Sequence, residues 1–191
     1  MKKNTTSSAD LESHELPDEM FLEHVIAEGV HGVYRTLSFT SSPAVMLCFA
    51  ANHFTQAAAR IYRQHYSIGV TDWRLLVMLT REPGATVSRA ADAIGIDKAA
   101  VSRSLQQLKE KGLAIQGEVQ ANGRSRGWTL TAGGRGLHDQ VLVEALARQR
   151  KLFAGFSADE VLQLNGMLRR ILANLKSLPA GEEADSDEPG L

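Results

Sequence analysis

The sequence predicts a mainly α-helical fold that carries one small β-hairpin. Helical periodicity covers most of residues 43–178, and helix-starting residues such as Ser42-Pro43 and Asp97 precede its segments. Two short runs, 113–118 and 127–130, have strand-like patterns and flank Asn122-Gly123, a pair typical of hairpin turns. We therefore expect helices on both sides of a single hairpin.

Composition excludes several classes of protein. The chain has 191 residues, of which only Cys48 is a cysteine, so an intramolecular disulfide framework and a multi-cysteine metal site are excluded. No apolar run approaches the roughly 20 residues of a membrane span, and the polar N-terminus lacks a secretory signal. We expect a cytoplasmic protein without a membrane partner.

The charge is unevenly distributed. The formal net charge is −1, but residues 1–30 carry 2 basic and 7 acidic groups, and residues 179–191 carry 5 acidic groups and no basic one. Residues 71–136 carry 10 basic and 6 acidic groups. Because phosphate binding depends on local patches and not on the total, this basic middle is compatible with a nucleic-acid partner.

The first 81 residues divide into an arm and two helices. Residues 1–16 are polar and are expected to be disordered. Pro17-Asp18-Glu19 predicts a short helix that runs toward Gly29. Ser42-Pro43 predicts the N-cap and first turn of a long helix over 43–66, and Thr71-Asp72 predicts the cap of the next.

Two further short helices are expected before the hairpin. Thr86 caps the first, over 87–94, and Gly95 stops it. Asp97 caps the second, over 98–111, and Gly112 stops it.

Two helices should follow the hairpin. Thr131 starts the first, which Gly133, Gly134 and Gly136 weaken by about 1 kcal/mol each against alanine. Ser157 and Glu160 form a capping box for the last helix. That helix carries apolar residues at alternating steps of three and four: Val161, Leu164, Leu168, Ile171 and Leu175. This seam either packs inside one subunit or, with the long helix 43–66, builds a shared dimer core.

Residues 86–130 have the order helix, glycine turn, helix, strand, loop, strand, which is the plan of a winged helix-turn-helix. In the helix 98–111 the apolar Val101, Leu105 and Leu108 share one face. The opposite face offers side chains suited to the major groove, where arginine pairs with guanine and glutamine with adenine. These DNA-binding candidates are Lys98, Ala99, Ser102, Arg103, Gln106 and Gln107. In the hairpin loop, Arg124 and Arg126 could enter a minor groove.

The chain resembles the MarR family of bacterial transcriptional regulators. The resemblance rests on Thr71 to Leu79, Asp97 to Leu105, Leu108 to Leu113, and Asn122 to Arg126 followed by Leu130 to Arg135, and it extends over roughly residues 43–178. It implies a homodimer whose terminal helices interlock and whose two winged helices contact one pseudo-palindromic DNA operator. One departure is that Asn122-Gly123-Arg124 stands where the family often has Asp-Arg-Arg.

The resemblance also divides the chain. It implies an N-terminal arm (1–40), a long dimerisation helix (41–70), a DNA-binding domain (71–131), C-terminal dimerisation helices (132–178) and an acidic disordered tail (179–191). The expected function is that of a regulator, a repressor, that a small aromatic or phenolic effector releases from operator DNA.

The family implies an effector crevice between the dimer helices and the winged domain. Candidates to line it are His53, Arg60, Trp73 and Arg74, because an arginine beside an aromatic wall can hold an aromatic acid.

Two alternatives remain open at this point. Leu47-Cys48-Phe49-Ala50 resembles the family branch that senses organic hydroperoxides through a cysteine hydrogen-bonded to tyrosines of the partner subunit. Tyr62 lies fourteen residues further on, as one such tyrosine does, and Asn52 stands where another tyrosine is expected. The other alternative is a winged helix that binds only proteins. Protein-binding faces favour exposed aromatic residues, whereas the outward face of the helix 98–111 carries small residues, an arginine and amides.

No enzymatic function is expected. The sequence has no Ser/His/Asp order, Walker loop or dinucleotide fingerprint, and its six histidines show no metal-ligand spacing. We expect no metal and no cofactor. The expected partners are double-stranded DNA, a second copy of the chain and a small-molecule effector.

Overall fold

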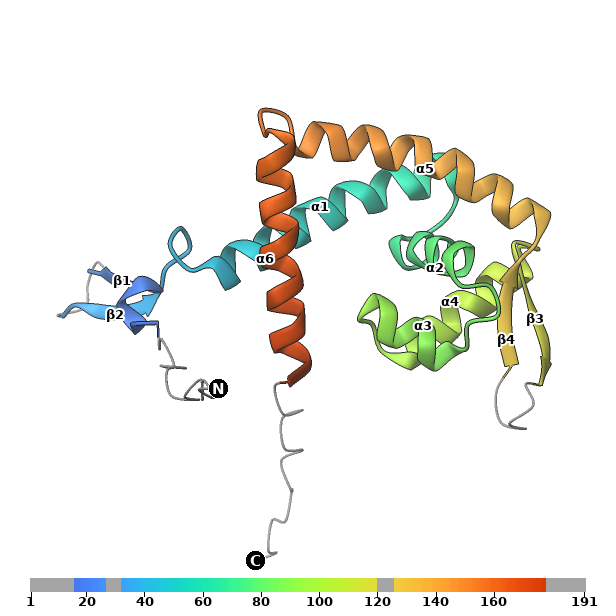
Figure 1. Cartoon of the computed structure of the whole chain (residues 1–191), viewed down its shortest axis with the longest axis horizontal. Helices are drawn as coiled ribbons and strands as arrows, with labels where there is room; N and C mark the ends of the chain where they lie inside the picture. The colour runs from blue at the N-terminus through green and yellow to red at the C-terminus, as the bar shows by residue number, and fades with distance from the viewer. Residues whose placement is uncertain (1–15, 27–31, 120–125, 178–191) are drawn as a thin grey trace, which may run out of the picture.

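The computed structural model of the protein describes residues 16–26, 32–119 and 126–177. Two long helices, α1 (Pro43–Tyr66) and α5 (Ala132–Leu152), lie side by side along one edge of the molecule. Three short helices lie beneath them: α2 (Val70–Arg81), α3 (Val87–Ile94) and α4 (Lys98–Glu110). The last helix, α6 (Ala158–Ser177), projects away from this group (Figure 1).

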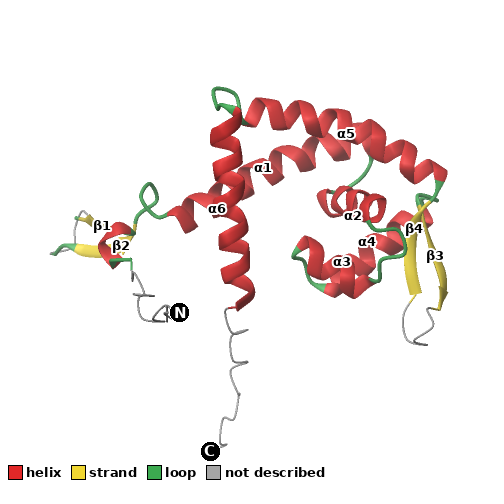
Figure 2. Ribbon diagram, viewed as in Figure 1, coloured by secondary structure: helices red, strands yellow, loops and turns green. Residues whose placement is uncertain are grey.

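The predicted hairpin is present next to the short helices. Strands β3 (Ala114–Val119) and β4 (Arg126–Leu130) pair antiparallel, with Ala114 opposite Leu130 (Figure 2). The predicted mainly helical fold with a small wing is therefore confirmed. The predicted turn pair Asn122-Gly123 lies outside the described residues.

Most helix starts are where the sequence places them. The Thr86 hydroxyl accepts a hydrogen bond from the N–H of Arg89, and the Asp97 carboxylate accepts one from the N–H of Ala100 at 2.8 Å. Thr131 caps α5, and Ser157 and Glu160 form the expected capping box of α6.

The predicted cap of α2 was wrong. The helix begins earlier, with Gly69 as N-cap, and Asp72 is its third helical residue. The Asp72 carboxylate reaches back and accepts a hydrogen bond from the N–H of Gly69 at 2.9 Å. An acidic residue therefore supports this helix start as the second half of a capping box rather than as the cap.

The helix predicted from Pro17 toward Gly29 was also wrong. Only one 3-10 turn, η1 (Asp18–Met20), forms, and β1 (Leu22–Val25) follows it. This strand pairs antiparallel with β2 (Tyr34–Leu37), so the fold has a second hairpin that was not expected. A helix this short is marginal without tertiary contacts, whereas pairing with β2 satisfies the backbone groups of β1.

The hydrophobic core lies within the winged helix. Its largest fully buried side chains come mainly from α2 and α4, and the predicted apolar face of α4 is among them. They are Ile68, Leu75, Leu76, Leu79, Val101, Leu105, Leu108 and Val141. Trp128 and Leu130 of β4 join this core, which fixes the wing to the helices.

Two of the glycines near the start of α5 have opposite environments. A Cβ built on Gly134 would overlap the backbone carbonyl of Leu113, whereas a Cβ on Gly136 would meet no atom within 4 Å. Gly134 therefore permits close packing of α5 on the strand β3 side of the wing, and Gly136 only weakens the helix.

Alanine substitutions at these two glycines are expected to act in opposite directions. Gly134→Ala should lower the free energy of unfolding by about 1–3 kcal/mol, because the added methyl group forces backbone apart. Gly136→Ala should raise it by up to about 1 kcal/mol, the difference in helix propensity. Urea denaturation of both variants measures this, and equal shifts of the same sign would contradict the packing described.

Candidate nucleic-acid interface

The exposed face of α4 has the composition that the sequence predicts for a recognition helix. Val101, Leu105 and Leu108 are completely buried against the core. All six candidates on the opposite side are exposed to solvent: Lys98, Ala99, Ser102, Arg103, Gln106 and Gln107. The structure thus brings them together on one accessible surface.

The polar groups on and near this face differ in whether they already form hydrogen bonds or ion pairs within the chain. Gln106 donates a hydrogen bond from Nε2 to the carboxylate of Glu110 at 3.2 Å, one turn further along α4. Arg103 has no ion-pair partner among the described residues. At the helix start, the N–H of Ala100 already donates to Asp97, so it is not available to a phosphate. Arg103 is therefore the side chain best placed to contact a base edge.

The wing lies beside α4 and is anchored at its base. Trp128 of β4 is 4% exposed, and its backbone N–H donates to the carbonyl of Ala85 at 2.9 Å, in the loop between α2 and α3. Arg126, the first residue of β4, is exposed. Arg124, the other wing candidate, lies outside the described residues.

A buried polar pair joins α4 to α2. The Ser104 hydroxyl donates a hydrogen bond to the carboxylate of Asp72, and both residues are about 95% buried. At the other end of α4, the Lys111 ammonium donates to the backbone carbonyl of Ser67 at 2.7 Å. Helix α4 is therefore held at two points by the corner between α1 and α2. The sequence analysis missed this, although Ser104 falls on the apolar face of α4.

Asp72→Ala is expected to lower the free energy of unfolding by about 1–3 kcal/mol. The substitution removes the capping bond to Gly69 and leaves the Ser104 hydroxyl buried without its acceptor. Asp92→Ala, at an exposed position of α3, serves as the control and should change stability by no more than about 0.5 kcal/mol.

A double-mutant cycle with Ser104→Ala isolates the pair. Because the two side chains interact directly, Ser104→Ala should cost less in the Asp72→Ala background than in the wild type. Strictly additive losses in urea denaturation would show that the two side chains do not stabilise each other.

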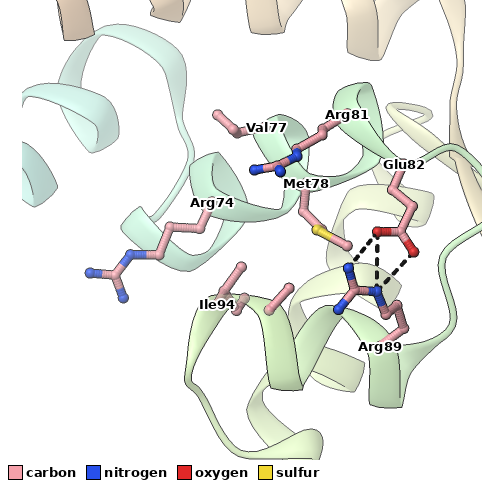
Figure 3. A pocket seen from close by; sticks show the side chains of 8 residues that line it. Arg74, Val77, Met78, Arg81, Glu82, Arg89 and Ile94 are labelled. Atoms are coloured by element: carbon pink, nitrogen blue, oxygen red, sulfur yellow. Dashed lines mark hydrogen bonds and ion pairs between the residues drawn. The ribbon is translucent and has the colours of Figure 1, made fainter. Parts of the chain in front are cut away.

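Two adjoining hollows lie between α2 and α3. Trp73, Arg74, Val77 and Ile94 line the first, which has a volume of about 320 Å³. The second, of about 340 Å³, shares three of these residues and extends to Met78, Arg81, Glu82, Arg89 and Ala93 (Figure 3).

The charges of the hollows are not equivalent. Arg89 forms a two-pronged ion pair with Glu82, with Nε and Nη2 each 2.9 Å from a carboxylate oxygen (Figure 3). Hydrogen bonds from Arg89 hold the pKa of Glu82 below its usual range. Arg74 and Arg81 have no ion-pair partner among the described residues, so they remain available to an anion.

The structure brings together only two of the four effector candidates. Trp73 and Arg74 line the same hollow, whereas His53 and Arg60 are exposed on α1 and line neither hollow. The sequence analysis missed Val77, Arg81 and Ile94. The spacing of Arg74, Val77 and Arg81 on one helix, three and then four residues apart, could have indicated a shared face.

Trp73 is also part of an aromatic cluster. Its ring stacks on that of His138 from α5 at 5.5 Å and lies 6.0 Å from that of Tyr62 in α1. Tyr62 is 3% exposed, and burial raises the pKa of its hydroxyl. The hollow is thus adjacent to the contact between the long helices and the winged helix.

The redox candidates Cys48 and Tyr62 are far apart within one chain. Cys48 is exposed near the start of α1, and Tyr62 is buried near its end. Fourteen residues of helix separate them by about 21 Å. No pairing of this thiol with Tyr62 occurs within the subunit.

The predicted apolar seam of α6 is only partly covered in the described chain. No residue of α6 is buried, and Ile171 and Leu175 are 38% and 55% exposed. Val161, Leu164 and Leu168 are half-buried. Near the start of α1, Met46 and Phe49 are 50% and 41% exposed. A large apolar area therefore faces solvent in a single chain.

The described residues hold neither a metal-binding cluster nor a membrane-spanning helix. No group of three or more potential metal-ligating side chains is found there. None of the helices in that part of the chain is long and apolar enough to cross a membrane.

Comparisons with known proteins agree with this geometry. The MarR family model matches residues 66–125. The chain is similar in structure to a MarR/EmrR family transcriptional regulator from Acinetobacter sp. ADP1, with 26% identity and a TM-score of 0.68 over 73% of this chain and 99% of that one.

Two further solved structures have the same fold. The MepR–DNA complex of S. aureus matches with 22% identity and a TM-score of 0.62, over 72% of this chain and 97% of that one. The PcaV transcriptional regulator of Streptomyces coelicolor, solved with its natural ligand, matches with 19% identity and a TM-score of 0.61, over 73% of this chain and 98% of that one.

The helices α2, α3 and α4 with the β3–β4 wing form a winged helix-turn-helix. Long helices on both sides of it in the sequence complete the architecture. The MarR family model matches residues 66–125, which include α2, α3, α4 and β3 of this winged helix.

Proposed function

We propose that this protein is a transcriptional regulator, a repressor, that binds a pseudo-palindromic DNA operator as a homodimer. The observation that carries the proposal is the exposed face of α4, where Arg103 stands among small and amide side chains. Arginine in this setting pairs with guanine in the major groove. We assign DNA contacts to residues 71–131, with Arg126 and Arg124 of the wing in the minor groove. The MepR–DNA complex supports this reading of the fold.

The homodimer is supported by the uncovered apolar surface of α6. Val161, Leu164, Leu168, Ile171 and Leu175 repeat at steps of three and four residues, as in helices that pack on one another. A second copy would bury this seam together with the exposed start of α1, so we assign dimerisation to residues 41–70 and 132–178. Two-fold symmetry would place the two α4 helices about one DNA turn apart.

The residues that line the α2–α3 hollow are best suited to bind a small aromatic acid as effector. Arg74 and Arg81 supply positive charge without a partner among the described residues, and Trp73 supplies an aromatic wall. Carboxylates pair strongly with arginine, and the apolar Val77 and Ile94 would hold the ring. PcaV, which was solved with its natural ligand, is a precedent for a ligand in this fold. The effector would release the protein from DNA.

Binding to DNA is tested with the full-length protein and a labelled fragment from upstream of its own gene. We expect a complex that survives an excess of random competitor DNA and weakens as the salt concentration rises, because phosphate contacts release counterions. Binding that random DNA removes completely, or no binding at low salt, would favour a protein-interaction module instead.

Cys48→Ser is expected to retain DNA binding and release by a small aromatic acid such as salicylate. No lysine, arginine or histidine lies within four residues of Cys48 in the sequence, and Tyr62 is buried within its own chain. The measurement is DNA release by near-stoichiometric organic hydroperoxide. Release of the wild type but not of Cys48→Ser would replace the small-molecule mechanism with a redox one.

A further inference from the structure

The hairpin of β1 and β2 stands apart from the rest of the described chain. It lies at the end of α1 that is far from the winged helix (Figure 1). Leu22 pairs with Leu37 and Val25 with Tyr34. Apart from the adjoining η1, no other helix or strand of the described chain provides the hairpin with a substantial packing surface. Because an isolated two-stranded hairpin is only marginally stable in water, this one needs a surface to cover it.

A structured joint connects the hairpin to α1. The buried Ser38 hydroxyl accepts hydrogen bonds from the backbone N–H groups of Thr40 and Ser41, at 3.2 and 3.0 Å. The next ring, Phe39, contacts Phe49 of α1 edge to face at 5.1 Å. The hairpin is therefore held at the end of α1 in a defined direction, as an arm and not as a loose tail.

One face of this arm is apolar and acidic. Val25 and Tyr34 are opposite each other on the two strands and are 39% and 44% exposed. Glu23, two residues before Val25, lies on the same face because side chains alternate along a strand. Glu19 is paired with Arg35 at 2.8 Å, whereas Glu23 has no ion-pair partner among the described residues.

One flank of α6 has the complementary character. At about 100° per residue, four side chains lie about 40–120° around the helix from Leu168, beside the apolar seam. They are Leu162, Arg169, Leu172 and Lys176. Leu162 and Leu172 are 66% and 58% exposed, and neither basic residue has an ion-pair partner in the described part of the chain.

We propose that the arm of one subunit packs on this flank of α6 in a second copy of the chain. The inference rests on the proposed homodimer and adds a contact to it. Apolar side chains meet apolar side chains, and Glu23 faces Arg169 or Lys176. The arm does not pack on α6 of its own chain, because both elements are described and have no substantial contact. Two-fold symmetry makes the contact twice in each dimer.

Cross-linking between differently tagged subunits tests the contact. In a Cys48→Ala background, Val25→Cys is introduced in one subunit and Leu172→Cys in the other, the subunits are mixed and exchanged, and a short bismaleimide is added. We expect a covalent product that carries both tags. Ile115→Cys, paired with Leu172→Cys, is the control. Ile115 is at least as accessible to the reagent as Val25 but lies on β3 in the wing, away from the arm (Figure 1), so it should give little product.

The outcomes separate this inference from the homodimer itself. An intact dimer in sedimentation without product above the control would overturn the inference and leave the homodimer standing. A monomer in sedimentation would overturn both. Product that carries only one of the two tags would place the two arms, or the two α6 helices, against each other and also overturn the inference.

A pair of substitutions on opposite faces of the arm provides a second test. Tyr34→Asp should raise the dissociation constant of the dimer at least tenfold, because it places a charge in the proposed contact. Leu37→Asp, on the other face of the hairpin and 52% exposed, should change it less than threefold. Equal effects of the two variants, or none from Tyr34→Asp, would contradict the face assigned to the contact.

Discussion

Leu168→Glu is expected to convert the protein to a monomer and to abolish binding to operator DNA. Leu168 lies at the centre of the α6 seam, where no residue is fully buried within the described chain. If a second copy covers the seam, the carboxylate introduced in each subunit is buried without a partner. Leaving a charge unpaired in an interface costs about 3–5 kcal/mol. Because α6 packs on little else, the winged helix itself should remain folded.

Analytical ultracentrifugation measures this directly, and circular dichroism checks that helices are retained. Leu175→Glu, two turns further along the seam, should have the same effect. Gln163→Glu is the matched control, because it adds the same charge to an exposed position on the opposite side of α6. If both leucine variants remained dimeric and bound DNA like the wild type, the interface would have to lie elsewhere.

Arg103→Ala is expected to weaken binding to specific DNA by about 1–3 kcal/mol, which is roughly a 5- to 150-fold loss of affinity. The side chain is exposed at the middle of the recognition face and is not held by an ion pair within the described chain. Binding to random DNA should fall much less, because phosphate contacts dominate there.

Fluorescence anisotropy with specific and random duplexes separates these two effects. Arg150→Ala removes the same charge from an exposed position at the end of α5, away from the wing, and serves as the control. It should leave the ratio of specific to random affinity unchanged. A wild-type ratio for Arg103→Ala would mean that this arginine does not contact a base.

The helices could be predicted because their determinants are local. Ser42 and Pro43 start α1 within two residues, and Asp97 and Gly112 flank α4. The exposed face of α4 follows from helical periodicity alone. The family resemblance added the homodimer and the effector, which remain proposals.

The features that the sequence did not predict depend on contacts between distant residues. The β1–β2 pairing places Leu22 opposite Leu37, and the sequence between them has no clear strand or turn pattern. The bond between Ser104 and Asp72 spans 32 residues, and the need for glycine at position 134 arises from the backbone of Leu113. Of the effector candidates, His53 and Arg60 lie on α1 and do not line the hollow that contains Trp73. The residues near them in the sequence do not indicate this, because it depends on how α1 packs on α2.

Selection of DNA from a random library by the full-length protein tests the central claim most directly. An exposed α4 in each half of a two-fold dimer predicts an enriched inverted repeat whose half-sites are about 10 base pairs apart, centre to centre. In each half-site, the enrichment of one base should disappear with Arg103→Ala. Selection that enriches no motif, or only a single unrepeated one, would contradict a homodimer that reads DNA through α4.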